Sequence, residues 1–460
     1  MATPQSLKHQ RSTSSRSSRP RASTKGPLDL PDDDPLSSDD PASPRSPQKS
    51  QARTSHLSSD VGPSDSFDLK SLNAEIDSIL ASESVTSTAK DLSFLLRPEI
   101  YHPLSQLEIP PVFRTPFYSP SIEEPIEVSM GILNGFLTQG HFLLAAHLCA
   151  ILLTSPAIRP LDRQTIFTLF YTRLACLELT GNTAFAAQES KALEDLHSTF
   201  YYVDTDLEVA GDTKPQTRYR NSYHIVPWPL RVLAVRLQSI GFGDSRRGIT
   251  GLYELGFEAR AEAMRPGLDK AKKQIWQERL SDLGIRSVNA LVEMGDLDAA
   301  QRSLGSLGLG DSDAIKVRAG LLALRIGDIT TAKDILDKSS VLREGVLKPL
   351  TSMADGNYDE AISEWRTLLE TSPKSAEPMI VQNLAVCLLY TGQLNEARSL
   401  LESLISANHS FQSLTFNLAT IYELCSDKSR DLKVRLVQDV SKHPHTGDAN
   451  VDRTTSDFKL

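Results

Sequence analysis

Apolar and polar residues divide the chain near residue 66. Residues 1–66 contain only eleven apolar residues among seventeen serines and nine prolines. Such a segment cannot bury enough apolar surface to offset its ordering entropy. Apolar residues then recur at the spacing of one helix face: Leu69, Leu72, Ile76, Ile79 and Leu80. The pattern predicts a disordered tail and then a short amphipathic helix, docked on the protein's own body or, alternatively, on another protein.

Prolines interrupt the helical pattern between residues 98 and 125. Seven prolines fall in this stretch, with Tyr101, Phe113, Phe117 and Tyr118 between them. Prolines at this density forbid a continuous helix, and the aromatic side chains argue against a free linker. We therefore expect residues 67–125 to form the short helix followed by an extended strap along the folded body.

Beyond residue 125 the hydrophobic pattern repeats. Two units recur 36 residues apart: Gly356, Ala361 and Trp365 in the first, and Gly392, Ala397 and Leu401 in the second. A glycine suits a tight turn between helices, where a side chain would clash. A small alanine lets the two helices approach, and the larger residue fills the groove to the next hairpin. The pattern resembles the second half of a tetratricopeptide repeat, whose period is about 34 residues.

The same pattern is present upstream, with less regularity. Its turn glycines are Gly140, Gly181, Gly243, Gly295 and Gly327, and alanines follow at Ala300 and Ala332. In the unit at Gly243, Gly248 occupies the position where alanine is expected, and the polar stretch 204–221 predicts a loop insertion. The sequence predicts an all-α solenoid of about seven or eight helical hairpins over residues 126–441, followed by a polar tail over residues 442–460.

Charge and cysteine content narrow the possible functions. The formal charge of -9 argues against a general nucleic-acid binder. Four cysteines lie far apart without a CxxC spacing, so we expect neither a zinc site nor disulfides, and a reducing compartment fits. The longest apolar run, residues 142–153, is shorter than the roughly 20 residues that span a bilayer. We predict no direct membrane insertion and, from residues 1–28, no secretory signal.

Motifs that carry chemistry are sparse. The glycines at 305, 308 and 310 follow a predicted helix, whereas a dinucleotide fingerprint needs a preceding strand. We interpret them as an inter-repeat linker. No histidine has metal-ligand spacing, and no hydrolase or kinase signature is present. The sequence therefore predicts no catalytic residue, no metal or other cofactor and no small-molecule substrate. Ser43 and Ser46 each precede a proline and are candidate phosphorylation sites.

One subclass of tetratricopeptide repeats clamps the C-terminal carboxylates of chaperones through Lys, Arg and Asn side chains. In the clearest repeat we expect the first helix at residues 378–390, with Gln382, Asn383 and Val386 at the candidate binding positions. This helix contains no Lys or Arg, so the charge that would bind a carboxylate is missing. A co-chaperone role is disfavoured.

Two blocks near the C-terminus carry a more specific resemblance. They read A-V-C-L-L-Y at residues 385–390 and F-N-L-A-T-I-Y-E-L at residues 416–424. Together with V-P-W-P-L-R-V-L at residues 226–233 and R-I-G-D-I-T-T-A at residues 325–332, they resemble the trafficking protein particle (TRAPP) complex subunit 12 family. The resemblance runs in order over about residues 130–440.

The resemblance implies a non-catalytic subunit of a vesicle tethering complex that acts in ER-to-Golgi transport and autophagy. Its partners would be protein subunits of that complex, with no nucleic acid. Its place would be the cytoplasm and, through its complex, the surface of ER and Golgi membranes. Two alternatives stay open: a generic tetratricopeptide adaptor, and an auxiliary subunit of an unrelated enzyme complex.

Overall fold

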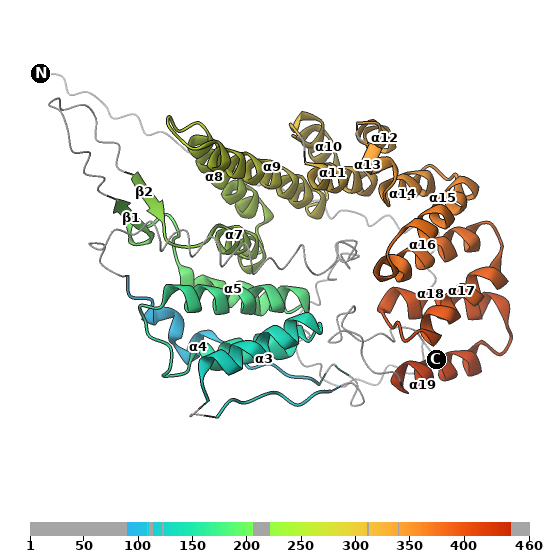
Figure 1. Cartoon of the computed structure of the whole chain (residues 1–460), viewed down its shortest axis with the longest axis horizontal. Coiled ribbons are helices and arrows are strands. Elements are labelled where there is room, and N and C mark those ends of the chain that lie inside the picture. Colours follow the sequence, from blue (N-terminus) through green and yellow to red (C-terminus); the bar gives the residue numbers. More distant parts are fainter. Residues whose placement is uncertain are drawn as a thin grey trace, which may run out of the picture. The chain divides into compact units, whose positions relative to one another are not determined.

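The computed structural model describes residues 90–107, 109, 114–121, 124–205, 221–310, 312–338 and 340–442. The expected tail at 1–66 with Ser43 and Ser46, the apolar stripe from Leu69 to Leu80 and the polar tail from residue 443 onward lie outside these residues. The described residues are almost entirely helical (Figure 1). This confirms the predicted all-α fold of tetratricopeptide-like hairpins.

The helices follow one another as antiparallel pairs. The pairs are α3 (Ile126–Thr138) with α4 (Phe142–Leu153), α5 (Arg163–Leu179) with α6 (Thr183–Ser190), α7 (Trp228–Phe242) with α8 (Ser245–Ala263), α9 (Lys270–Glu293) with α10 (Leu297–Ser306), α11 (Asp313–Ile326) with α12 (Ile329–Leu336), α14 (Leu347–Ala354) with α15 (Tyr358–Thr371), α16 (Glu377–Tyr390) with α17 (Leu394–Ser406), and α18 (Gln412–Cys425) with α19 (Ser429–Lys442). The short helices α13 (Ser340–Arg343) and η7 (Lys374–Ala376) precede α14 and α16. Helices pack mainly on their neighbours in sequence, as in a solenoid.

The seven glycines assigned to the turns all have left-handed backbone conformations. Their φ angles lie between +62° at Gly243 and +90° at Gly327, where an L-residue costs roughly 1–2 kcal/mol. At three turns an aspartate follows the glycine and caps the next helix, and Asp244 does so by accepting a hydrogen bond from the backbone N–H of Arg246 at 3.0 Å. Asp296 accepts a hydrogen bond from the backbone N–H of Ala299 at 3.1 Å, and Asp328 accepts one from that of Thr331 at 3.0 Å. The latter bond, with others from Thr330, Thr331 and Gln301, lowers the pKa of Asp328.

The small residues of the repeat lie where paired helices cross. Ala300, Ala332, Ala361 and Ala397 are all fully buried. Gly248 occupies the position where the repeat pattern expects alanine, and the close approach of α7 explains the glycine. A Cβ added to it would lie 2.5 Å from the Cβ of Ser239, so α7 and α8 approach more closely than an alanine permits.

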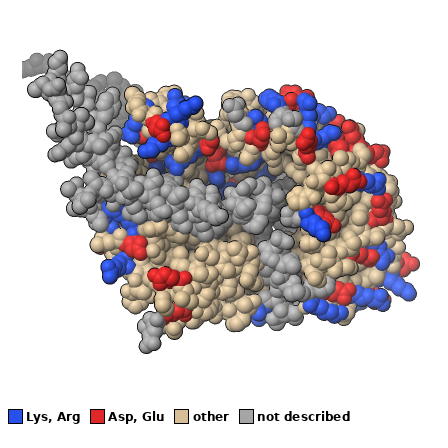
Figure 2. Space-filling view, viewed as in Figure 1, with Lys and Arg blue, Asp and Glu red and all other residues tan. Residues whose placement is uncertain are grey.

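The apolar core forms four clusters along the chain. The first joins residues 92–237, from the strap to α7. The second joins α7, α8 and α9 around Trp228, and the third joins α9 to α14. The last joins α15 to α19 around the fully buried Trp365. Acidic and basic side chains are intermixed on the outside of the C-terminal helices (Figure 2).

The predicted loop at residues 204–221 needs a correction at its ends. Strand β1 (Tyr202–Thr205) pairs antiparallel with β2 (Asn221–His224), with Tyr202 opposite His224. Val203 and His224 are buried. The rings of Tyr201 and His224 stack with their centroids 5.7 Å apart. Residues 206–220 are not among the described ones.

The strap starts with two tight turns before it becomes extended. The 3-10 turns η2 (Ser93–Leu96) and η3 (Pro98–Ile100) precede Tyr101, and Leu92 and Leu95 are fully buried in the first cluster. Two similar turns, η5 (Lys191–Leu193) and η6 (Thr199–Tyr201), connect α6 to β1. The strap is therefore part of the core of the first hairpins.

Candidate protein-interaction site

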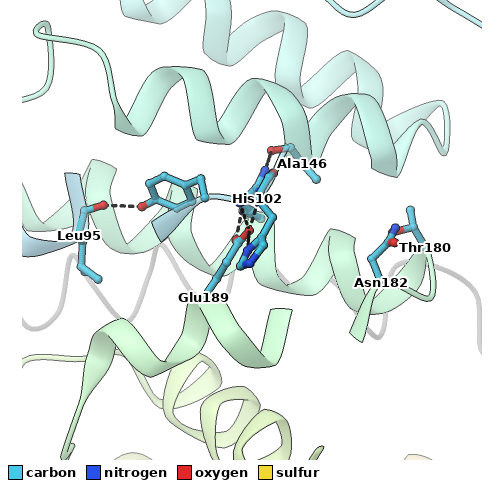
Figure 3. A network of polar contacts seen from close by, with 8 residues as sticks. Leu95, His102, Ala146, Thr180, Asn182 and Glu189 are labelled. Atoms are coloured by element: carbon cyan, nitrogen blue, oxygen red, sulfur yellow. Dashed lines mark hydrogen bonds and ion pairs between the residues drawn. The ribbon is translucent and has the colours of Figure 1, made fainter. Parts of the chain in front are cut away.

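A buried ion pair fixes the strap to the first hairpins. Arg173 in α5 is fully buried, and its Nε and Nη2 atoms each donate to Glu189 of α6 at 2.6 Å. Its remaining donors reach two backbone carbonyls, those of Ala146 at 2.8 Å and His102 at 2.9 Å. The backbone N–H of His102 completes the network by donating to Glu189 at 2.9 Å. Figure 3 shows His102, Ala146 and Glu189 converging.

The network satisfies both buried charges, so its role is structural. A buried charge left unpaired is costly, whereas here the guanidinium has four acceptors and the carboxylate has two sources of donors. Tyr101 adds to it by donating to the carbonyl of Leu95, with its ring 5.3 Å from the guanidinium. Burial raises the pKa of Tyr101, and the hydroxyl stays protonated. Our sequence analysis missed this network, although a lone arginine in the apolar run of α5 was a signal.

The buried cysteines and histidine are part of the packing. Cys149, Cys176 and Cys387 are buried free thiols, and burial raises the pKa of Cys149 to about 12, which leaves the unreactive thiol form. His224 is neutral: its Nε2 donates to the carbonyl of Leu196 at 2.9 Å, and its Nδ1 accepts from the N–H of Val226 at 3.0 Å. Among the described residues, no group of three His, Cys, Asp or Glu side chains could hold a metal ion.

The clearest surface for a partner lies on the first helices of the last two hairpins. Tyr390 of α16 is 66% exposed, and Phe416 and Leu424 of α18 are 52% and 60% exposed. We call these three residues, with Gln382, Asn383 and Val386, the apolar face. The charged residues of α16 and α18 are Glu377 and Glu423, and Glu423 pairs with Lys433 of α19.

The amide side chains expected at clamp positions are already engaged within the solenoid. Asn383 donates to the carbonyl of Met379 at 2.9 Å. Gln382 accepts from the hydroxyl of Ser413 at 3.1 Å, which links α16 to α18. With no cation in either helix, this face offers a partner apolar contact area and no carboxylate clamp.

Tyr358 and Trp365, which both belong to α15, have different environments. Trp365 is fully buried, and its indole N–H donates to the sulfur of Met353 at 3.2 Å. Tyr358 is only partly buried and stacks on the exposed ring of Tyr390, with centroids 4.7 Å apart and planes 3° apart. The stack extends the apolar face to the start of α15.

The residues of the repeat signature lie inside the fold and not on this face. Gly295, Gly327, Gly356 and Gly392 are in the turns, and Ala300, Ala332, Ala361, Ala397, Trp365 and Leu401 are buried at helix crossings. They set the geometry of the hairpins and present no side chain to a partner. The described residues include no helix with the length and apolar character needed to cross a membrane.

Comparison with known proteins agrees with this geometry. A family profile described as tetratricopeptide repeat matches residues 352–414, from α14 into α18. Fold and profile together show an all-α solenoid of tetratricopeptide-like hairpins. Trafficking protein particle complex subunit 12 of Homo sapiens is 27% identical over 249 residues, which cover 47% of this chain and 34% of the human protein. The Mus musculus protein of the same name is 29% identical over 249 residues, 47% of this chain and 31% of its own length.

These comparisons confirm the resemblance to subunit 12 of the TRAPP complex. The chain spans about a third of the length of the curated relatives that it matches.

Proposed function

We propose that this chain is a non-catalytic scaffold subunit of a TRAPP-type vesicle tethering complex in ER-to-Golgi transport and autophagy. It binds partner subunits through its helical-repeat surface. The observation that carries the proposal is the apolar face of α16 and α18, where three large apolar side chains are half exposed or more. Large apolar side chains exposed on the first helices of successive hairpins favour an interaction site. The similarity to subunit 12 indicates the kind of complex.

The chemistry of the apolar face limits the partner. A carboxylate-ended or strongly acidic peptide would find no cation in α16 or α18. The apolar side of an amphipathic helix, or an apolar patch on a folded subunit, matches the exposed rings and Leu424. Tyrosine is among the residues that dominate binding energy when they are buried at interfaces, so Tyr390 is the expected centre of the contact.

The remaining assignments follow from this function. The partners are protein subunits of the complex, with no nucleic acid and no small-molecule substrate. The protein is cytoplasmic and reaches ER and Golgi membranes through its complex. The repeat-signature glycines and alanines keep the hairpins in register, and Ser43 and Ser46 are candidate phosphorylation sites that would add negative charge to a basic segment of the tail.

Affinity purification of the full chain from its native cells, followed by mass spectrometry, tests the proposal. We expect the wild-type chain to recover several tethering-complex subunits together. The double variant Tyr390→Arg/Phe416→Arg is expected to lose them, because two charges would be buried against an apolar partner.

The control is Leu161→Arg/Leu297→Arg, which places the same charges on exposed leucines away from α16 and α18. It should recover the subunits as the wild type does. Recovery of one catalytic chain without tethering subunits would support an auxiliary subunit of an unrelated enzyme complex. Recovery of unrelated proteins alone would support a generic adaptor. Equal loss in both variants would remove the apolar face from the proposal.

A further inference from the structure

The hairpin of α8 and α9 ends in an exposed tip. Residues 269–275 are exposed without interruption, and Met264 and Ile275 on either side of the turn are 73% and 48% exposed. In a solenoid of packed hairpins, an unbroken exposed run that includes the first turn of a helix shows that the tip extends beyond its neighbours. We call residues 264–275 the α8–α9 tip.

Exposed apolar side chains continue from the tip along α8. Phe257 is 66% exposed and Tyr253 is 50% exposed. Tyr253 and Phe257 are four residues apart, and Met264, which directly follows α8, lies seven residues beyond Phe257. This spacing places the three side chains on one face of the helix. The opposite face carries the residues that α8 buries, among them Leu252, Leu255 and Ala259. The exposed stripe is therefore not required to hold α8 in the fold.

The tip is also basic. Lys270, Lys272 and Lys273 open α9, and none of their side chains is hydrogen-bonded or ion-paired to another described residue. Arg265 is paired with Glu262 at 3.2 Å. Figure 2 shows blue Lys and Arg side chains at this end of the hairpin, with acidic side chains among them, in a chain whose formal charge is -9.

These lysines are in an unfavourable place for the helix itself. A helix N-terminus carries partial positive charge and favours acidic residues in its first turn. The first turn of α9 has no acidic residue, and Asp269, at the cap position, makes no side-chain cap hydrogen bond. Folding of α9 therefore does not explain the three lysines at this position, whereas binding of an anionic ligand would explain them.

We propose that the α8–α9 tip binds the surface of an anionic lipid bilayer. Lys270, Lys272 and Lys273 would face the charged headgroups, and Met264, Ile275 and Phe257 would enter the boundary between headgroups and acyl chains. Clustered lysines beside exposed apolar and aromatic side chains are the features by which amphipathic elements bind such surfaces. This contact lies on the surface and involves no spanning segment.

The shape of the tip favours a bilayer over an acidic protein. Peptides are recognised in grooves or at sheet edges, where backbone and side-chain positions are fixed. The tip is instead a protruding end whose three lysine side chains are not paired with any other described residue, and a broad charged surface can contact it from one side. The inference stands on residues 253–275 alone and does not depend on which complex the chain joins.

Vesicle flotation of the full chain tests the proposal. Vesicles of phosphatidylcholine alone are compared with vesicles that contain about 30% phosphatidylserine, at low and high salt. We expect the chain to float with the anionic vesicles and to be released by salt. The triple variant Lys270→Glu/Lys272→Glu/Lys273→Glu should bind them about a hundredfold more weakly, since each lysine near an anionic surface contributes roughly tenfold or less.

A matched control changes the same net charge elsewhere. Lys338, Lys374 and Lys428 are exposed, and Lys338→Glu/Lys374→Glu/Lys428→Glu should keep vesicle binding within about threefold of the wild type, since distant charges are screened. The tip variant should melt no lower than the wild type, because acidic residues suit the first turn of α9. Phe257→Ser is expected to weaken binding at low salt about tenfold, through loss of apolar contact.

Three results would overturn the proposal. The first is equal flotation with neutral and anionic vesicles, or none with either. The second is equal loss in the tip variant and the control variant. The third is unchanged flotation of the tip variant with loss of partner proteins in a purification, which would assign the tip to an acidic protein surface. Because vesicle flotation uses the purified chain alone, failure here leaves the scaffold proposal untouched.

Discussion

The first and last clusters of the described chain are stabilised in different ways. In the first, Arg173 and Glu189 bind the strap at His102, which lies 71 and 87 residues away in sequence. In the last, side-chain links join elements about one repeat apart, as between Arg366 and Glu396 or between Gln382 and Ser413. The first cluster depends on one buried polar network, and the last depends on a repeated local pattern.

The stability of a solenoid can therefore be concentrated in one buried polar network or distributed over many similar repeats. A repeat array is approximately a sum of units and nearest-neighbour interfaces, so a lesion in one unit stays local. A buried polar network is strong only when every member is satisfied, so a lesion in one member affects all the segments that it joins. Substitutions in the two clusters can test this contrast.

Trp365→Ala is expected to have the largest effect. Trp365 is the largest fully buried side chain of the described residues, and replacement of a buried tryptophan by alanine costs about 4–5 kcal/mol. Hydrogen exchange should become faster in α14–α17 and stay unchanged in α4–α6. Faster exchange throughout both clusters would contradict the local character of the C-terminal repeats.

Arg173→Met should destabilise the first cluster by about 4 kcal/mol, because it leaves the carboxylate of Glu189 buried and unpaired. Urea denaturation gives the free energy of unfolding, and exchange of the His102 amide reports release of the strap. The matched control is Arg366→Met, which removes an exposed ion pair in which Arg366 and Glu396 are 2.7 Å apart. It should lower the free energy of unfolding by at most about 1 kcal/mol. Similar costs for the two variants would refute the special role of the network.

Acid should destabilise the β-hairpin region through His224. Burial, together with the nearby charge of Arg231, lowers the pKa of His224 to about 4. The unfolded chain takes up a proton below pH of about 6.5 while the folded state stays neutral, so stability is lost as the pH falls from about 6.5 to 4. The full difference is about 3 kcal/mol. His224→Gln should flatten this part of the stability profile; an unchanged slope would show that other groups cause it.

Gly392→Ala should have the smallest effect, a loss of about 1–2 kcal/mol, because φ of +79° is strained for any residue with a Cβ. The matched control is Gly131→Ala in the interior of α3. A Cβ there meets no atom within 4 Å, so alanine should stabilise the helix by about 0.5–1 kcal/mol. Thermal melting of both variants checks the opposite signs. A loss at both positions would mean that the turn conformation is not the cause.

The sequence predicted those parts of the fold that are encoded locally. The turn glycines and the helices on either side of them were assigned because a positive φ and a short run of apolar spacing are properties of adjacent residues. Gly248 was anomalous in sequence, because only the approach of α7 to α8 explains it. The ends of strands β1 and β2 were read as loop, since fifteen residues lie between even the nearest partners, Thr205 and Asn221.

The candidate site was predicted only in part. The absence of Lys and Arg from residues 378–390 was visible in sequence and already disfavoured a carboxylate clamp. That Tyr390, Phe416 and Leu424 are exposed was not visible, because in an apolar helix the sequence does not say which side the neighbouring helices cover. The same holds for Phe257 of α8 and for Met264, which directly follows this helix; the hydrophobic pattern alone would assign both to the core.

The class of fold, the seven glycine turns of the repeats and the resemblance to subunit 12 could be predicted from the sequence alone. Only the tertiary structure decided which residues meet across long separations, namely Arg173 with Glu189 and His102, and which apolar residues stay exposed. The physical reason is the range of the forces involved. Backbone conformation and helical periodicity act between neighbours in the chain, whereas desolvation and ion pairing depend on everything that is packed around a group.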